Sequence, residues 1–185
     1  MWLWQGRKSK RTKGNTKLSP KAYLTSGRAR KLPVYECLVA AGWKEMGQSP
    51  VIVARQHVNG IITFANFLVD IFCTGVKDAF CQVNIEADDY QEIVEKSIPA
   101  DMEMIKIEYN LAHNIIYEAL SFAADYHIDP HPDFKLVGMV LAEDDESIPM
   151  IEITTGKDGK PLLVTNPDDD RANYYRKQLE KGQGN

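Results

Sequence analysis

The sequence predicts an α+β fold, in which hairpins build an antiparallel sheet of about five or six strands and one long helix packs on a face beside shorter helices. Two runs rich in β-branched and aromatic residues flank Asn59-Gly60, the dipeptide that most readily adopts the positive φ angles of a tight hairpin turn. A second pair of runs flanks Asp158-Gly159. Between the two pairs, residues 101–127 repeat apolar side chains three or four positions apart, which indicates a helix.

The first half of the chain is expected to supply most of the sheet. Residues 1–15 have little to bury after the opening Met-Trp-Leu-Trp, so we expect them to be disordered when free. A short helix is predicted from Pro20, with Ser19 as its N-cap and Gly27 at its end. Four strands follow. The third has apolar side chains at both its odd and its even positions, which predicts a central strand covered on both faces. Their predicted ranges are 33–40, 51–58, 61–70 and 79–85.

The second half is expected to supply most of the helices. Residues 86–97 predict a surface helix with acids in its first turn, where the helix dipole favours them. The long helix follows over 101–127, then a shorter one over 133–141, a hairpin over 149–167 and a C-terminal helix. One side of the long helix is apolar, with Ile105, Ala112, Ile116, Ala119 and Ala123. Another side carries a polar stripe of Glu103, Lys106, Asn110, His113, Tyr117 and Ser121.

Charge divides the chain into unlike parts. Residues 1–31 hold ten Lys or Arg and no Asp or Glu, so their formal charge is +10, whereas the remainder holds twelve basic and 26 acidic residues and carries −14. We therefore predict a basic, largely extended arm over 1–31, an α+β domain over 32–167 and a C-terminal helix and tail over 168–185. Such an asymmetry concerns association with an anionic partner rather than the fold.

The basic arm predicts binding to nucleic acid. Cations spaced by Gly, Ser, Thr and Asn, together with Tyr23 and two tryptophans for stacking, suit an irregular RNA surface better than a DNA groove. A solvated tail, or one that folds back onto the acidic body, is the alternative interpretation. The residues expected to contact phosphates are Arg7, Lys8, Lys10, Arg11, Lys13, Lys17, Lys21, Arg28, Arg30 and Lys31.

Three residues are candidates for catalysis. Asp70 lies in an apolar strand, where a carboxylate needs a partner, and Arg55 or Lys77 is the expected one. A cap on the following turn is the structural alternative for Asp70. His113 lies on the polar stripe and is a general base if that stripe lines a cleft; otherwise it faces solvent or bonds to a neighbouring strand. An active site would require Asp70, Lys77 and His113 to converge.

Alternating His and Asp residues mark the turn after the long helix. Asp125, His127, Asp129, His131 and Asp133 offer nitrogen and oxygen ligands, which makes His127, Asp129 and His131 candidates for a divalent metal. The two prolines in this turn favour the alternative, in which the segment is an ordinary turn between two helices. No recognised ligand spacing is present, so the sequence predicts no cofactor.

Cysteine usage and hydropathy indicate a compartment. Cys37, Cys73 and Cys81 form no CxxC pair and leave one over under any pairing, which favours a reducing cytoplasm over a secreted disulfide scaffold. No segment approaches the roughly 20 continuous apolar residues of a membrane span, so no membrane partner is expected.

Several phrases of the sequence resemble a family of small bacterial proteins that has no established activity. They are RARKLPVYECL, NGIITFANFLVDIFCTGVKDAF, PHPDF and GKDGKPLLV, within roughly residues 28–165. The resemblance implies a bacterial cytoplasmic protein and assigns no residue a role.

Three functions follow from these patterns. The leading hypothesis is a non-enzymatic protein that binds structured RNA such as the ribosome through the arm. The second is a metal-dependent hydrolase or nuclease with its site among Asp70, His113, His127 and His131. The third is a protein–protein module of a defence or toxin-neutralising system, in which the arm holds an acidic partner protein.

Overall fold

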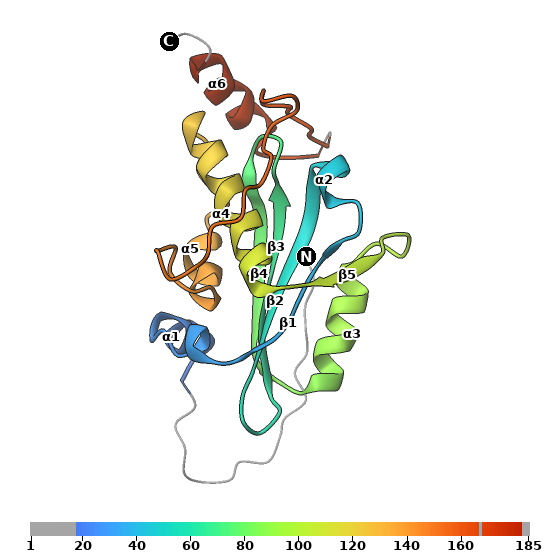
Figure 1. The fold of residues 1–185 in the computed structure, drawn as a ribbon, viewed down its shortest axis with the longest axis vertical. Helices are drawn as coiled ribbons and strands as arrows, with labels where there is room; N and C mark the ends of the chain where they lie inside the picture. Colours follow the sequence, from blue (N-terminus) through green and yellow to red (C-terminus); the bar gives the residue numbers. More distant parts are fainter. Residues whose placement is uncertain (1–17, 167, 183–185) are drawn as a thin grey trace.

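The computed structural model describes residues 18–166 and 168–182, and five antiparallel strands form its sheet (Figure 1). The strands lie in the order β4-β3-β2-β1-β5, so only β5 lies out of chain sequence. The α+β class is confirmed. Their bounds are Val34–Ala40 (β1), Gln48–Gln56 (β2), Ile62–Asp70 (β3), Gly75–Ile85 (β4) and Met104–Ile107 (β5).

The β2–β3 hairpin forms where the sequence predicts it. Gln56 pairs with Ile62, the backbone N–H of His57 donates to the carbonyl of Ile61 at 2.8 Å, and Gly60 has φ +84°. β3 lies between β2 and β4, and every one of its side chains except Leu68 is buried. The prediction of an interior strand covered on both faces is therefore confirmed.

The long helix is shorter than predicted. Residues 104–107 form β5, which pairs with β1 from Cys37↔Ile107 to Ala40↔Met104. α4 begins only at Tyr109 and ends at Asp125. A sequence pattern cannot show that β1 has an open edge whose backbone groups need partners, and the isoleucines of this segment suit such a strand.

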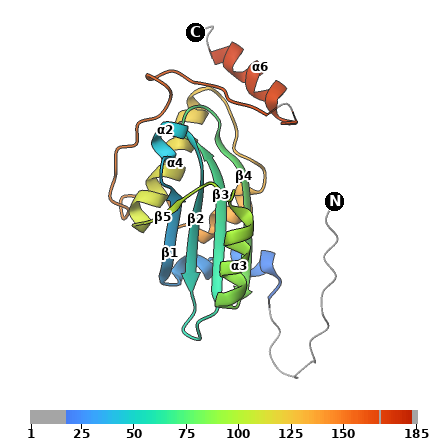
Figure 2. The ribbon, with the colours of Figure 1, turned by 90° about the vertical axis from the view of Figure 1, so that its right-hand side faces the viewer.

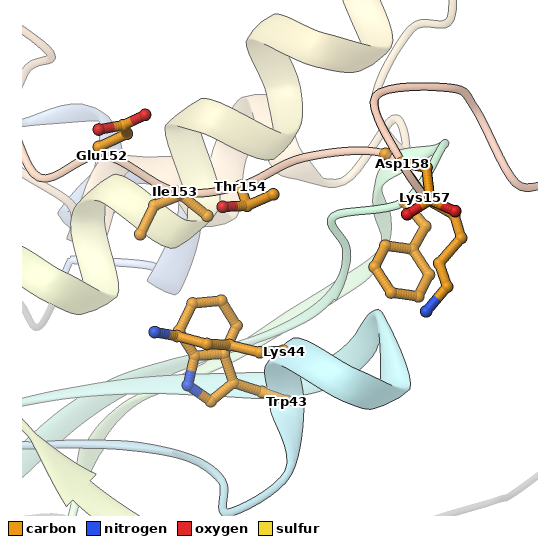
Figure 3. Close-up of a pocket in the computed structure, with 9 residues that line it drawn as sticks. Trp43, Lys44, Glu152, Ile153, Thr154, Lys157 and Asp158 are labelled. Atoms are coloured by element: carbon orange, nitrogen blue, oxygen red, sulfur yellow. The ribbon is translucent and has the colours of Figure 1, made fainter.

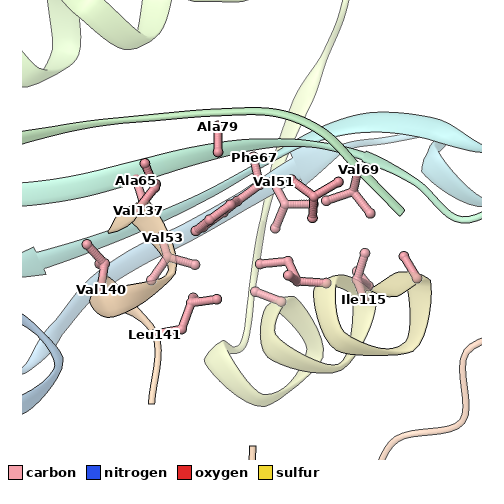
Figure 4. Packing of buried hydrophobic residues seen from close by; sticks show 14 of the residues in the cluster. Val51, Val53, Ala65, Phe67, Val69, Ala79, Ile115, Val137, Val140 and Leu141 are labelled. Atoms are coloured by element: carbon pink, nitrogen blue, oxygen red, sulfur yellow. The ribbon is translucent and has the colours of Figure 1, made fainter. Parts of the chain in front are cut away.

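α4 covers one face of the sheet, and the larger core lies between them (Figure 4). Of the predicted apolar side, Ala112, Ile116, Ala119 and Ala123 are buried, whereas Ile105 is exposed on β5. Two short helices, α5 (Phe134–Val137) and the 3₁₀ turn η2 (Gly138–Val140), close the same layer where a helix over 133–141 was predicted. Buried members of this core include Val51, Val53, Ala65, Phe67, Val69, Ile115, Val137, Val140 and Leu141.

α3 (Ala87–Ser97) lies against the opposite face and confirms the predicted surface helix (Figure 2). Its inward side chains Tyr90 and Val94 pack on Ile52 and Phe64 in a second, smaller core. The hydroxyl of Tyr90 also donates to the carboxylate of Glu36 at 2.8 Å, which ties the helix to β1. The sheet is thus a middle layer with helices on both faces.

The described part of the basic segment is folded. Ser19 accepts a hydrogen bond from the N–H of Ala22, and α1 (Pro20–Thr25) follows as predicted, with Gly27 at φ +69° just after it. Leu24 and Ala29 are fully buried, the latter in the 3₁₀ turn η1 (Ala29–Lys31). Within the predicted basic arm, α1 and η1 therefore contribute side chains to the core. The expected disorder of residues 1–15 lies outside the described residues.

Of the predicted second hairpin, only the tip at Asp158 and Gly159 forms within the described residues. Residues 149–166, called the strap below, make a single bridge, Lys157↔Lys160, around the turn at Asp158 and Gly159. On either side of this turn the strap bonds to the turn between β3 and β4 instead of to itself. The N–H of Gly156 donates to the carbonyl of Ile71, and the N–H of Leu162 donates to the carbonyl of Phe72. The predicted C-terminal helix is confirmed as α6 (Ala172–Gly182). Over the described ranges, no helix is long and apolar enough to cross a membrane.

Candidate functional site

A cleft of about 300 Å³ opens between α2 (Trp43–Met46), the turn that joins β3 to β4, and the strap (Figure 3). Three segments far apart in the chain meet there. Two aromatic rings, two lysines and two carboxylates face a space of a small ligand's size. The lining residues are Trp43, Lys44, Phe72, Glu152, Ile153, Thr154, Gly156, Lys157 and Asp158.

Asp70 holds the turn on which the cleft is built. Its carboxylate is fully buried and accepts from the backbone N–H groups of Phe72 (2.9 Å), Cys73 (3.1 Å) and Thr74 (3.3 Å), and from the hydroxyl of Thr74 (2.7 Å). Burial raises the pKa of Asp70, while the hydrogen bonds from Thr74 and Phe72 oppose that shift. Of the two interpretations, the structure shows the cap on the following turn.

The expected cation partners of Asp70 are engaged elsewhere. Arg55 is buried and donates to the carbonyl oxygens of Val140 (2.8 Å) and Leu32 (2.7 Å), with its guanidinium 5.0 Å from the ring of Tyr109. It therefore joins the sheet to η2 and η1 and does not pair with the carboxylate of Asp70.

Phe72 forms one wall of the cleft because the turn and a glycine place it. Its N–H is held by Asp70, and its ring lies over Gly47, which ends α2 with φ +73°. A Cβ atom at Gly47 would overlap the ring of Phe72. The ammonium of Lys157 lies 5.6 Å from the centroid of that ring. A lysine from the strap thus covers an aromatic wall that the sheet turn supplies.

Trp43 forms the second aromatic wall, and a lysine lies over this ring too. Its side chain is only 6% exposed, and the ammonium of Lys44 lies 5.4 Å from the indole centroid. Figure 3 shows Lys44 beside Trp43, with Ile153 and Thr154 on the strap across from them. Aromatic faces bordered by cations suit a planar ligand that carries negative charge.

A second pocket, of about 620 Å³, brings together Lys77 and His131. Lys77 forms an ion pair with Asp169 at 3.3 Å and donates to the carbonyl of Val164 at 3.1 Å. Nδ1 of His131 accepts from the N–H of Asp133 at 3.3 Å. Lys77 therefore anchors the strap and the loop before α6 to the sheet, a structural role.

His113 lies apart from both pockets. It is 1% exposed, Nε2 lies 3.3 Å from the carbonyl oxygen of Ala142, and the ring stacks on Tyr117 at 4.4 Å. Burial lowers the pKa of His113, and the contacts with Ala142 and Asp144 oppose this. Asp70, Lys77 and His113 line no common pocket among the described residues, so the convergence that catalysis would require is not found.

The turn proposed to bind metal serves as the docking point of α6. His127 adopts φ +57° just after α4, and its carbonyl accepts from Gln178 at 2.8 Å. The carboxylate of Asp129 accepts from the hydroxyl of Tyr174 at 3.2 Å, and its carbonyl from Arg171. In the part of the chain that the structure describes, no three His, Cys, Asp or Glu residues are grouped to hold a metal ion.

Four of the ten predicted phosphate contacts lie in the described residues. Lys21, Arg28 and Lys31 are exposed on α1, η1 and the turn between them. Arg30 is paired with Glu143 at 2.7 Å. The other six, Arg7, Lys8, Lys10, Arg11, Lys13 and Lys17, lie outside the described residues.

Comparisons with protein-family models, curated proteins and solved structures found no match to this chain. The resemblance to a bacterial family therefore stays a prediction.

Sequence reasoning did not find the cleft. The predicted elements include neither Trp43 nor Phe72, and the strap was predicted to be a hairpin. The one available signal was Asp70, since a carboxylate directly before Ile-Phe-Cys-Thr-Gly indicates a capped turn.

Proposed function

We propose that the protein binds nucleic acid, and specifically structured RNA such as the ribosome, through residues 1–31, called the basic segment below. The observation that supports this proposal is the segregation of charge: the formal charge is +10 on this segment and −14 on the remainder. Cations that neutralise phosphates release condensed counterions, which is the main source of affinity for nucleic acid. A polyphosphate presents a denser array of charge than the carboxylates of the protein's own surface.

The anchoring of the basic segment supports the proposal. Tyr23, Leu24 and Ala29 are buried, so the chain enters the domain at a fixed place, where α1 and η1 pack against α5 and η2. Lys21 and Arg28 are exposed beside this anchor. A fixed exit point limits the conformations lost on binding, which favours association.

The enzymatic alternative has less support. Asp70, Lys77 and His113 each have structural partners, and none of these partners is shared. The proposal therefore stays non-enzymatic. Cytoplasmic location is part of it, since Cys37, Cys73 and Cys81 are free and the first two are buried.

RNA affinity of two matched variants tests the proposal. In the first, the six cations of residues 7–17 are replaced by Gln. In the second, six exposed cations of the domain are replaced instead: Lys96, Lys106, Lys160, Arg176, Lys177 and Lys181. Both variants lose six positive charges, so they have the same net charge and differ only in where it is removed.

We expect fluorescence anisotropy with ribosomal RNA at low salt to show a loss of at least about 100-fold in the first variant and a small change in the second. Equal losses would mean that net charge alone acts, and unchanged binding in the first would refute the proposal. If the protein recovered from cells keeps a protein partner after nuclease treatment and binds no RNA, the protein–protein alternative replaces it.

A further inference from the structure

We infer that the cleft between α2 and the strap holds one nucleotide of a single-stranded stretch of RNA, with the base against Trp43 or Phe72 and the phosphate beside Lys44 or Lys157. The inference rests on the proposed function and adds to it a site that contacts a base. The basic segment would supply charge, and the cleft would select unpaired nucleotides.

The aromatic walls supply the stacking surface. Every base has a flat π face, so stacking on an aromatic side chain tolerates any sequence and requires only an unpaired base. Trp43 and Phe72 belong to the larger core and are 6% and 8% exposed, and the ammonium groups of Lys44 and Lys157 lie 5.4 and 5.6 Å from their ring centroids. Both lysines are exposed side chains, so they can move from the rings without disturbing the core.

The lysines supply the charge that a nucleotide needs. Each has a flexible four-carbon stem, so its ammonium can exchange a contact with a ring for one with a phosphate. The same two side chains therefore cover the aromatic faces when the cleft is empty and pair with the ligand when it is filled. Glu152 and Asp158 oppose a phosphate, so a free mononucleotide should bind weakly.

The strap supplies hydrogen bonds for the edge of a base. Thr154 lies across from Trp43, and a hydroxyl both donates and accepts. Glu152 belongs to the same segment, but its carboxylate points away from Trp43. The hydroxyl of Thr154 comes from the wall opposite α2, as a base standing between the two walls requires.

The walls are held in place before any ligand arrives. Gly156 and Leu162 of the strap donate to the carbonyls of Ile71 and Phe72 at 2.9 and 3.0 Å. Asp70 fixes the backbone of the same turn. A volume of about 300 Å³ is at the small end of ligand pockets and suits one nucleotide better than a larger cofactor.

A single indole resonance reports on the cleft directly. The chain has three tryptophans, so the full-length variant Trp2→Phe/Trp4→Phe leaves Trp43 as the only one. Its indole N–H signal is followed in ¹H–¹⁵N spectra while AMP, GMP, CMP or UMP is added to 10 mM. Ribose 5-phosphate and inorganic phosphate are the probes without a base.

We expect a saturable shift with at least one mononucleotide and at least tenfold weaker binding of ribose 5-phosphate. Replacing Lys44 and Lys157 by Met keeps the aliphatic stems and removes the charge, and we expect it to weaken mononucleotide binding about tenfold. The matched control replaces Lys96 and Lys177 by Met and should leave binding unchanged.

Three results would overturn the inference: no shift at 10 mM, equal binding of ribose 5-phosphate, or equal binding by both lysine variants. Failure of the proposed function is distinguishable from these. If mononucleotides shift Trp43 but RNA affinity ignores the basic segment, the cleft binds free nucleotides and the proposed function falls. If RNA binds through the basic segment and Trp43 does not respond, the cleft inference falls alone.

Discussion

Replacing Asp70 by Ala should destabilise the protein by about 3–6 kcal/mol. The carboxylate is fully buried and accepts from three backbone N–H groups and the hydroxyl of Thr74, so its removal leaves four buried donors without an acceptor. Each unsatisfied buried group costs about 1–3 kcal/mol, and the hydroxyl can rotate to another acceptor. The three N–H groups therefore set a lower limit of about 3 kcal/mol.

Replacing Asp70 by Asn should cost less, about 1–2 kcal/mol, because one carbonyl oxygen still accepts from Phe72 and Cys73. Urea denaturation followed by far-UV circular dichroism measures both changes. Asp101→Ala, at an exposed turn, is the control and should stay within about 0.5 kcal/mol of the parent. A loss below about 3 kcal/mol for Asp70→Ala, or equal losses for Ala and Asn, would refute the assignment of Asp70 as the cap of this turn.

Three further predictions concern the fold around the sites. Leu24→Ala should lower the free energy of unfolding by about 2–5 kcal/mol, since Leu24 is fully buried; a negligible change in urea denaturation would mean that α1 is only an appendage. Gly47→Ala should destabilise by at least about 2 kcal/mol and shift the Trp43 indole resonance, because the new Cβ overlaps Phe72 and φ is positive; an unshifted spectrum would contradict this. Burial lowers the pKa of His113 from its ordinary value of 6.5. Below pH 6.5 the unfolded chain therefore binds more protons than the folded protein, and the stability that is present above this pH is lost as the pH falls toward the folded pKa. His113→Gln should therefore flatten the stability profile between about pH 7 and 5, whereas parallel profiles would show that folding leaves the pKa of His113 at its ordinary value.

Local chemistry made much of the fold predictable. Asn59-Gly60 specifies a hairpin by backbone conformation alone, and Ser19-Pro20 specifies a helix start by its capping bond. Both signals act over a few residues, and both were confirmed. The acidic first turn of α3 belongs to the same class.

The errors arose where distant partners decide the structure. Residues 104–107 have a helical pattern but pair with the free edge of β1. The strap looks like a hairpin, yet its N–H groups bond to Ile71 and Phe72. Backbone groups bond to whatever acceptor the tertiary fold presents, and the sequence of one segment does not contain that information.

The sites were less predictable than the fold for the same reason. Asp70 was recognised as unusual because a lone carboxylate among apolar residues needs partners, although its partner was expected to be a cation. The cleft was missed because Trp43, Phe72 and Lys157 are more than 25 residues apart from one another. Only the fold shows that they meet.

The salt dependence of RNA binding tests the central claim most directly. The logarithm of the affinity falls with the logarithm of salt concentration by about 0.7–0.9 per phosphate contacted. If the cations of residues 7–17 contact phosphates, their replacement by Gln should reduce the slope by about 4–5 units, and the domain control should keep the parent slope. Equal slopes for the parent and the first variant would contradict the claim that the basic segment binds RNA.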